Sequence, residues 1–162
     1  MYVEFNDMSE DSRVWVYQAA RQFTSTEKAL IASKLTAFCD GWNTHGNRMP
    51  TSFQIIDDQI LVLAVDESGL GASGCSIDSS VRTLRELERE IVNNLTDQGK
   101  VTFKSNSGEI NVASALGIKS KVTSGEIDSQ TLVINPQVKN KKDLESVWIL
   151  AGNSWLNRYF PN

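Results

Sequence analysis

Residues 52–65 read SFQIIDDQILVLAV, and this stretch decides the fold. Two runs rich in large apolar residues are separated by Asp57, Asp58 and Gln59, which is the pattern of a tight β-hairpin. The second run, residues 60–65, is apolar at every position, as in a strand buried on both faces. The sequence therefore predicts a sheet with strand 60–65 at its centre.

A strand and a helix are predicted ahead of this hairpin. Residues 13–19, RVWVYQA, alternate so that Trp15 and Tyr17 share one face, which is typical of a strand. Thr24 and Glu27 then have the spacing of a capping box and predict the start of a helix. The apolar stripe of that helix consists of Ile31, Leu35, Phe38 and Trp42.

A second helix and a second hairpin come next. The helix follows a Gly/Ser-rich loop, and Ser76 is a candidate for its N-cap. Its apolar stripe consists of Val81, Leu84, Leu87, Ile91 and Leu95. Alternating runs at 101–103 and 110–112 flank a turn at 106–108, which predicts a hairpin. Residues 113–129 predict only an irregular connection or a short ragged strand.

The C-terminal part of the chain predicts one strand and one helix. Residues 131–135, TLVIN, have the composition of a strand. Residues 144–159 carry apolar side chains at three- and four-residue steps, which favours an amphipathic helix capped near Asn140. These side chains are Leu144, Val147, Trp148, Ala151, Trp155 and Tyr159.

The first six elements run strand, helix, strand, strand, helix, strand. This is the order of a ferredoxin-like split βαβ sandwich, an α+β fold. The length of 162 residues favours a single domain over 1–162. Within it we expect a βαββαβ-like core plus hairpin in 1–112, followed by the irregular segment, strand and closing helix in 113–162.

The composition is that of an ordinary globular chain, 40% hydrophobic and 22% charged, with no apolar run near the roughly 20 residues of a membrane span. Its 16 basic and 20 acidic side chains give a net charge of -4, which argues against nucleic acid or anionic lipid as a partner. The first residues lack a secretory signal, and the two cysteines are far apart. We therefore expect a soluble cytoplasmic protein without a cofactor.

Residues 60–78, ILVLAVDESGLGASGCSID, contain three overlapping nucleotide-binding signatures. ILVLAVDE resembles the acidic strand of ABC ATPases, GLGASGCS resembles a phosphate loop, and GLGASG fits GxGxxG. The phosphate loop has Cys75 in place of its lysine, and Asp66 and Glu67 lie on the same strand that feeds the loop. The dinucleotide pattern fails because acidic residues separate strand from glycines. We therefore predict neither ATPase activity nor dinucleotide binding.

The predicted topology brings two loops to one end of the sheet. Strands 13–19 and 52–56 are parallel in the ferredoxin-like order, and strand 60–65 runs back to the same end. Loops 42–51 (WNTHGNRMPT) and 66–76 (DESGLGASGCS) then lie side by side, and a helix N-terminus there favours an anion. The candidate ligand-binding residues are Arg13, Arg48, Glu67, Ser73, Gly74 and Ser76.

The same end holds a candidate catalytic set. A thiol at a helix start has a stabilised thiolate, so Cys75 could act as nucleophile, with His45 as base and Asp66 orienting the imidazole. We favour a structural interpretation, in which Ser73 and Ser76 cap the helix, Cys75 is a small buried residue and His45 caps the preceding helix. No pair has the short spacing of zinc ligands, so no metal site is predicted.

Three motifs also resemble a known family. VWVYQAAR near the start, W-x-x-H-G at 42–46, and LAVDES followed by ASGCSID are similar to small bacterial proteins often labelled "ABC transporter ATPase". The resemblance covers most of the chain, and ASGCSID is its most specific part. It implies no activity but marks residues in the two loops, namely Trp42, His45, Gly46, Asp66, Glu67, Ser68, Ser73, Gly74, Cys75, Ser76 and Asp78.

Two functions remain open. The first, which we expect, is a noncatalytic module that binds a small anionic ligand or a partner protein through loops 42–51 and 66–76. The second is a cysteine-dependent acyl-transfer or hydrolase-type enzyme that uses Cys75, His45 and an oxyanion site of main-chain N–H groups at 74–76. The distance from the thiol to the imidazole and the reactivity of the thiol distinguish them.

Overall fold

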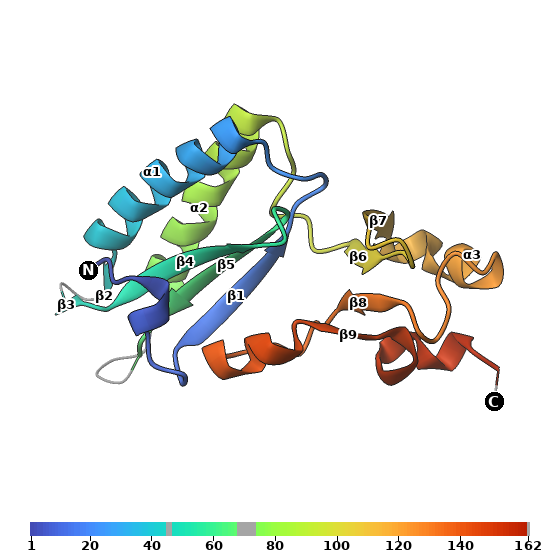
Figure 1. The fold of residues 1–162 in the computed structure, drawn as a ribbon. Coiled ribbons are helices and arrows are strands. Elements are labelled where there is room, and N and C mark those ends of the chain that lie inside the picture. The colour runs from blue at the N-terminus through green and yellow to red at the C-terminus, as the bar shows by residue number, and fades with distance from the viewer. Residues whose placement is uncertain (45–46, 68–73, 162) are drawn as a thin grey trace. The chain divides into compact units, whose positions relative to one another are not determined.

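The computed structural model describes residues 1–44, 47–67 and 74–161, and of residues 43–44, 47–48 and 74–76 it describes the main chain alone. The chain divides into two compact units (Figure 1). Unit 1 is Met1–Thr96 with Lys139–Lys142, and unit 2 is Asp97–Val138 with Asp143–Asn162. The first boundary between the units along the chain falls after Thr96. The single domain over 1–162, with its parts 1–112 and 113–162, stays a prediction.

Unit 1 contains an antiparallel sheet in the order β1-β5-β4, with β2 and β3 as a separate short pair. Because β1 and β4 both run antiparallel to β5, they are parallel to each other, and α1 connects them. The elements are η1 (Phe5–Asp7), β1 (Arg13–Gln18), α1 (Ser25–Gly41), β2 (Asn43–Thr44), β3 (Asn47–Arg48), β4 (Thr51–Ile56), β5 (Ile60–Val65) and α2 (Gly74–Ile91). The predicted first strand, first hairpin and two helices are confirmed.

The β4–β5 turn is built as the sequence predicts. Asp57 and Asp58 have φ of 52° and 58°, a left-handed conformation that Asp tolerates better than most residues. The buried Gln59 side chain donates a hydrogen bond to the Ala19 carbonyl oxygen at 3.0 Å, and the Ala19 N–H donates to the Gln59 carbonyl at 3.0 Å. The turn is thereby tied to the end of β1.

Both long helices cover one face of the β1-β5-β4 sheet (Figure 1). The shared core takes alternate residues of the strands and the apolar stripes of the helices, including Tyr17, Leu61, Leu63, Val65, Ile31, Leu35, Leu84 and Leu87. No residue of β5 is more than 1% exposed, so this strand is buried on both faces. The predicted central strand is confirmed.

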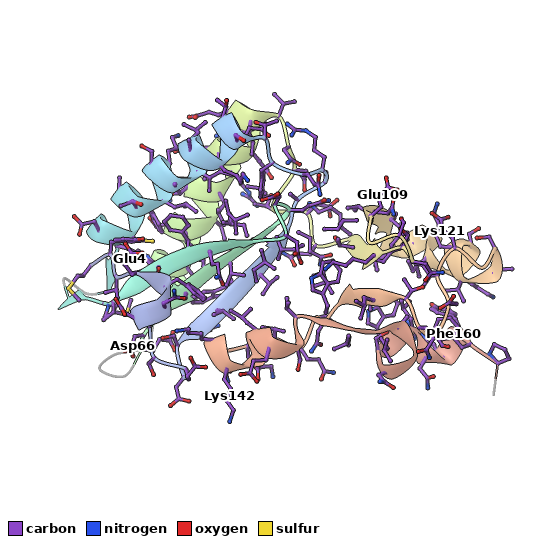
Figure 2. All side chains as sticks on the ribbon, viewed as in Figure 1. Glu4, Asp66, Glu109, Lys121, Lys142 and Phe160 are labelled. Carbon is purple, nitrogen blue, oxygen red and sulfur yellow. The ribbon has the colours of Figure 1, made fainter. Side chains whose placement is uncertain are left out.

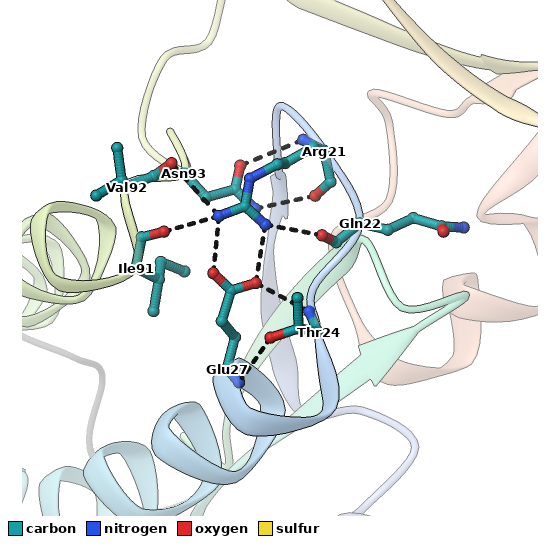
Figure 3. Close-up of polar contacts among 7 residues, drawn as sticks. All are labelled: Arg21, Gln22, Thr24, Glu27, Ile91, Val92 and Asn93. Carbon is teal, nitrogen blue, oxygen red and sulfur yellow. Dashed lines mark hydrogen bonds and ion pairs between the residues drawn. The ribbon is translucent and has the colours of Figure 1, made fainter.

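The first helix has the predicted capping box, and an unpredicted arginine extends it (Figure 3). Arg21 binds Glu27 through two nitrogens at 2.8 and 2.7 Å and donates to the Ile91 carbonyl oxygen at the end of α2 at 2.7 Å. The hydrogen bonds from Arg21 and from the Thr24 N–H lower the pKa of Glu27 to about 2. This cluster joins the start of α1 to the end of α2 at one end of the sheet.

Unit 2 is a second antiparallel sheet in the order β7-β6-β8-β9. Its elements are β6 (Lys100–Lys104), β7 (Ile110–Ser114), η2 (Ala115–Gly117), α3 (Ile118–Thr123), β8 (Leu132–Ile134), β9 (Trp148–Leu150), η4 (Ala151–Asn153) and η5 (Trp155–Tyr159), while η3 (Lys141–Ser146) crosses the boundary between units. Its core consists of Val101, Phe103, Ala113, Ile118, Ile127, Val133, Ala151 and Leu156. The predicted second hairpin and the strand near 131–135 are confirmed.

Among the described residues, the sheet of unit 1 has the three strands β1, β5 and β4 and lacks the fourth strand of the predicted ferredoxin-like order. β6, which would supply it, pairs with β7 on one side and β8 on the other. β6 therefore belongs to the sheet of unit 2. The chain is thus α+β with two main antiparallel sheets.

The predicted helix over 144–159 is wrong. Residues Trp148–Leu150 form β9 against β8, and the following residues form short 3₁₀ turns. Ser154 breaks the segment because its hydroxyl accepts a hydrogen bond from the Leu156 N–H at 3.1 Å and so starts η5. The apolar spacing at 144–159 matches a helix, but pairing with β8 takes precedence.

Two smaller predictions also need correction. Residues 113–129 were expected to be irregular or a ragged strand, but they contain the end of β7, η2 and α3. The hydroxyl of Ser114 accepts a hydrogen bond from the Leu116 N–H and starts η2. Ser76 cannot be the N-cap of the second helix, because α2 already begins at Gly74.

Candidate functional site

The candidate site lies at the end of the unit 1 sheet where β1 and β4 begin and β5 ends. Arg13 and Thr51 both pair with Val65 in the sheet register. Just beyond, the Asp66 N–H donates a hydrogen bond to the Pro50 carbonyl oxygen at 2.9 Å. Figure 2 shows Asp66 at this end of the sheet. The described ends of loops 42–51 and 66–76 thus lie at one end of the sheet, and their side-by-side course stays a prediction.

The helix α2 begins at this same end. Its last residue, Ile91, contacts Arg21, which follows the far end of β1. An 18-residue helix is about 27 Å long, so Gly74 lies back toward the end where β5 finishes. The first turn of α2 contains no acidic residue. Its main-chain N–H groups and the helix dipole therefore favour negative charge there.

Arg13 supplies a cation to this site. Its side chain is 46% exposed, and its Nη1 lies 3.4 Å from Oε1 of Glu67, whose side chain is 28% exposed. The guanidinium carbon lies 4.6 Å from the centroid of the Trp15 ring, within the range of a cation–π contact. Arg13 and Trp15 are two positions apart in β1, so both lie on the helix-covered face.

Trp15 is itself held by an aromatic cluster under the site. Its ring meets Trp42 edge to face with centroids 6.3 Å apart, and Trp42 meets Phe38 at 5.4 Å. Trp42 is buried, so the cluster is part of the unit 1 core. The fixed position of Trp15 restricts where the Arg13 guanidinium can lie.

The structure describes only some of the predicted site residues with their side chains. Arg13, Asp66 and Glu67 lie together at the sheet end. His45 and Ser73 lie outside the described residues, and Arg48, Gly74, Cys75 and Ser76 are described by their main chain alone, in β3 and in the first turn of α2. The catalytic pairing of Cys75 with His45 therefore stays a prediction. Sequence reasoning did not assign Trp15 to the site, although the spacing RVW already placed it beside Arg13.

The other cysteine has no place in this site. Cys39 is fully buried in the core of unit 1. Burial raises the pKa of its thiol to about 12, so it stays protonated near neutral pH. Among the described residues there is no group of three or more His, Cys, Asp or Glu side chains that could hold a metal ion.

A shallow groove lies elsewhere on unit 1. It has a volume of about 610 Å³ and is lined by Tyr2, Ala32, Ser33, Thr36, Ala37 and Asp40. None of these residues belongs to the predicted site. No helix in the described part of the chain is both long enough and apolar enough to cross a membrane.

Comparison of the chain with protein-family models, with curated proteins and with solved structures finds no match. The family resemblance carried by the ASGCSID motif therefore stays a prediction. The function has to be argued from the site alone.

Proposed function

We propose that this protein is a noncatalytic module that binds a small anionic ligand at the end of unit 1 formed by loops 42–51 and 66–76. The observation that carries the proposal is the exposure of Arg13 and the position of its guanidinium. The Arg13 side chain is about half exposed, its guanidinium contacts the Trp15 ring, and it lies at the end of the sheet where α2 begins. Arginine donates two parallel hydrogen bonds to a carboxylate or phosphate, the ligand chemistry that we infer.

Glu67 does not block this role. The Arg13–Glu67 contact joins one nitrogen and one oxygen at 3.4 Å between partly exposed side chains. Exposed ion pairs of this kind contribute about 0 to 1 kcal/mol. A ligand that accepts two short hydrogen bonds can therefore replace Glu67 at small cost. The carboxylate of Glu67 also makes the site selective, because only an anion that outcompetes it will bind.

A titration of the full chain with inorganic phosphate and, separately, with succinate tests the proposal. We expect saturable changes in the amide NMR signals of residues 13–15, 66–67 and 74–77. Arg13→Gln should weaken binding by at least about tenfold, since a hydrogen bond to a charged group contributes about 1.5 to 3 kcal/mol. Glu67→Gln should strengthen binding because it removes the competing carboxylate.

The matched control is Arg89→Gln. Arg89 is an exposed arginine in the last turn of α2, at the end of the helix away from the site, and the charge change is the same. This variant should bind like the wild type. Equal binding by Arg13→Gln and the wild type, or no saturable change at the site with either anion, would refute the proposal.

We also infer that unit 1 is a ferredoxin-like split βαβ arrangement that ends after its second helix. Support comes from the order β1-β5-β4, the parallel direction of β1 and β4, and the position of α1 and α2 on one face. Nuclear Overhauser contacts from β5 to both β1 and β4 test this order. Contacts from β6 to β1 would contradict the truncated form.

A further inference from the structure

Residues 139–142, here called the strap, belong to unit 1 although the chain before and after them belongs to unit 2. The strap lies against the outer edge of β1, where the Val14 N–H donates a hydrogen bond to the Lys139 carbonyl oxygen at 2.9 Å. A second hydrogen bond runs from the Lys141 N–H to the Ser12 carbonyl oxygen at 2.8 Å. A segment distant in the sequence therefore reaches the end of the sheet where β1 begins.

These two hydrogen bonds place Asn140 directly opposite Arg13, and the two residues form an isolated antiparallel bridge. Both bonds are made by the chain neighbours of the pair. Arg13 and Asn140 are therefore a non-hydrogen-bonded pair, the type in which the side chains approach more closely. Residues directly opposite each other project to the same face with Cβ atoms about 4.5 to 5.5 Å apart. The Asn140 side chain thus lies beside that of Arg13.

The strap is anchored mainly by Lys141. Its side chain is only 12% exposed, and its ammonium lies 3.5 Å from the Glu10 carboxylate and donates to the Met8 carbonyl oxygen at 2.8 Å. The Lys142 N–H adds a hydrogen bond to the Glu10 carbonyl oxygen at 3.0 Å. These contacts fix the main chain that carries Asn140.

We propose, on the basis of the anion-binding function of this site, that Asn140 supplies it with a second donor and that strap and anion stabilise each other's binding. The amide of asparagine carries two N–H donors. From its position beside Arg13, it can donate to an oxygen of the carboxylate or phosphate that the guanidinium binds. The strap also has three lysines, which bring positive charge to this end of the sheet.

The contact with Asn140 couples the ligand to the strap. An anion that accepts a hydrogen bond from Asn140 binds more tightly when the strap is in place against β1. Binding free energies are reciprocal, so the anion must make release of the strap less favourable by the same factor. An anion that contacted Arg13 without Asn140 would have no such effect. Protection of the strap amides therefore reports the Asn140 contact independently of the affinity.

Phosphate titration of the full chain tests the role of Asn140. Asn140→Ala removes the donor and should weaken binding by at least about tenfold. Asn140→Asp replaces the donor by a carboxylate of the same shape and should weaken binding further, because the carboxylate repels the anion. Gln22→Ala and Gln22→Glu are the matched controls and should bind like the wild type. Gln22 is exposed and follows β1 at the end of the strand away from the site.

Hydrogen exchange tests the coupling. Saturating phosphate should slow exchange of the Val14, Lys141 and Lys142 amides in the wild type by the factor that Asn140 contributes to the affinity, at least about tenfold. The same amides in Asn140→Ala should not respond to phosphate. The amides of the central strand β5 report that each variant is folded.

The outcomes separate this inference from the proposed function. If Arg13→Gln loses phosphate binding while both Asn140 variants bind like the wild type, Asn140 is no part of the site and the proposed function stands. Strap amides that do not respond to phosphate in the wild type would likewise overturn the inference alone. Equal binding by Arg13→Gln and the wild type, or no binding by the wild type, would overturn both.

Discussion

Replacing Val92 by glycine should make the protein more stable. Val92 follows the last residue of α2 with φ of 52°, a left-handed conformation that is a genuine outlier for a β-branched residue. The Asn93 N–H donates to Glu88 O at 3.1 Å, which makes this a Schellman end with valine at the position that favours glycine. Val92 is 81% exposed.

The magnitude follows from three terms. Relief of the left-handed conformation contributes up to about 2 kcal/mol for an L-residue. The greater backbone freedom of glycine in the unfolded chain costs about 0.5 kcal/mol. Since only about a fifth of the surface of Val92 is buried, the loss of apolar contact costs about 0.4 kcal/mol. The net expectation is a gain of about 1 kcal/mol in the free energy of unfolding.

Urea unfolding followed by tryptophan fluorescence and circular dichroism measures this gain. The midpoint should rise while the slope with denaturant stays constant, since the folded surface is nearly unchanged. Val92→Asn separates the causes: asparagine tolerates the left-handed conformation without the flexibility of glycine and should also stabilise. Val81→Gly, inside α2, should destabilise by about 1 kcal/mol or more. A Val92→Gly protein no more stable than the wild type would refute the reasoning.

Three further outcomes are expected. The pKa of Glu27 is lowered from 4.5 to about 2, so its stabilising contribution is complete above pH 4.5 and is lost as the pH falls toward 2. The difference in unfolding free energy between the wild type and Glu27→Gln should therefore shrink over that range. Parallel pH curves for the two proteins would contradict this. A thiol reagent near neutral pH should leave the buried Cys39 unlabelled in the folded protein. Fast labelling that persists in Cys39→Ser and is lost in Cys75→Ser would support the enzyme hypothesis. An inert Cys75 would support the binding module. A Cβ on Gly152 would lie 3.1 Å from a neighbouring side chain and from a main-chain oxygen, so Gly152→Ala should lower the unfolding free energy by about 1 kcal/mol. The control Gly117→Ala, which has open space around the new Cβ, should not. Similar effects of the two substitutions would show that the structure around residue 152 relaxes.

Elements predicted correctly from the sequence have local signals. The Thr24–Glu27 capping box spans one helical turn, and the hairpin at 52–65 combines two apolar runs with a short polar turn. The stripe of α2 is equally regular. In each case the local sequence signal lies within the element itself and agrees with the tertiary structure, so the local prediction holds.

The candidate site shows the limit of this reasoning. Alternation along β1 already placed Arg13 and Trp15 on one face, and the hairpin direction placed Asp66 beside the start of β4. The contact between Arg13 and Glu67, however, joins residues 54 positions apart, and its weakness depends on a distance and on exposure that only the structure supplies. That weakness is what makes a ligand exchange at Arg13 feasible.

By itself, the sequence determined the central strand 60–65 and the two long helices. Tertiary structure alone decided that β6 pairs with β7 and β8 and that Trp148–Leu150 forms a strand. The physical reason is that a strand acquires its hydrogen bonds from a partner distant in the chain. A period of three to four residues at 144–159 cannot reveal that partner.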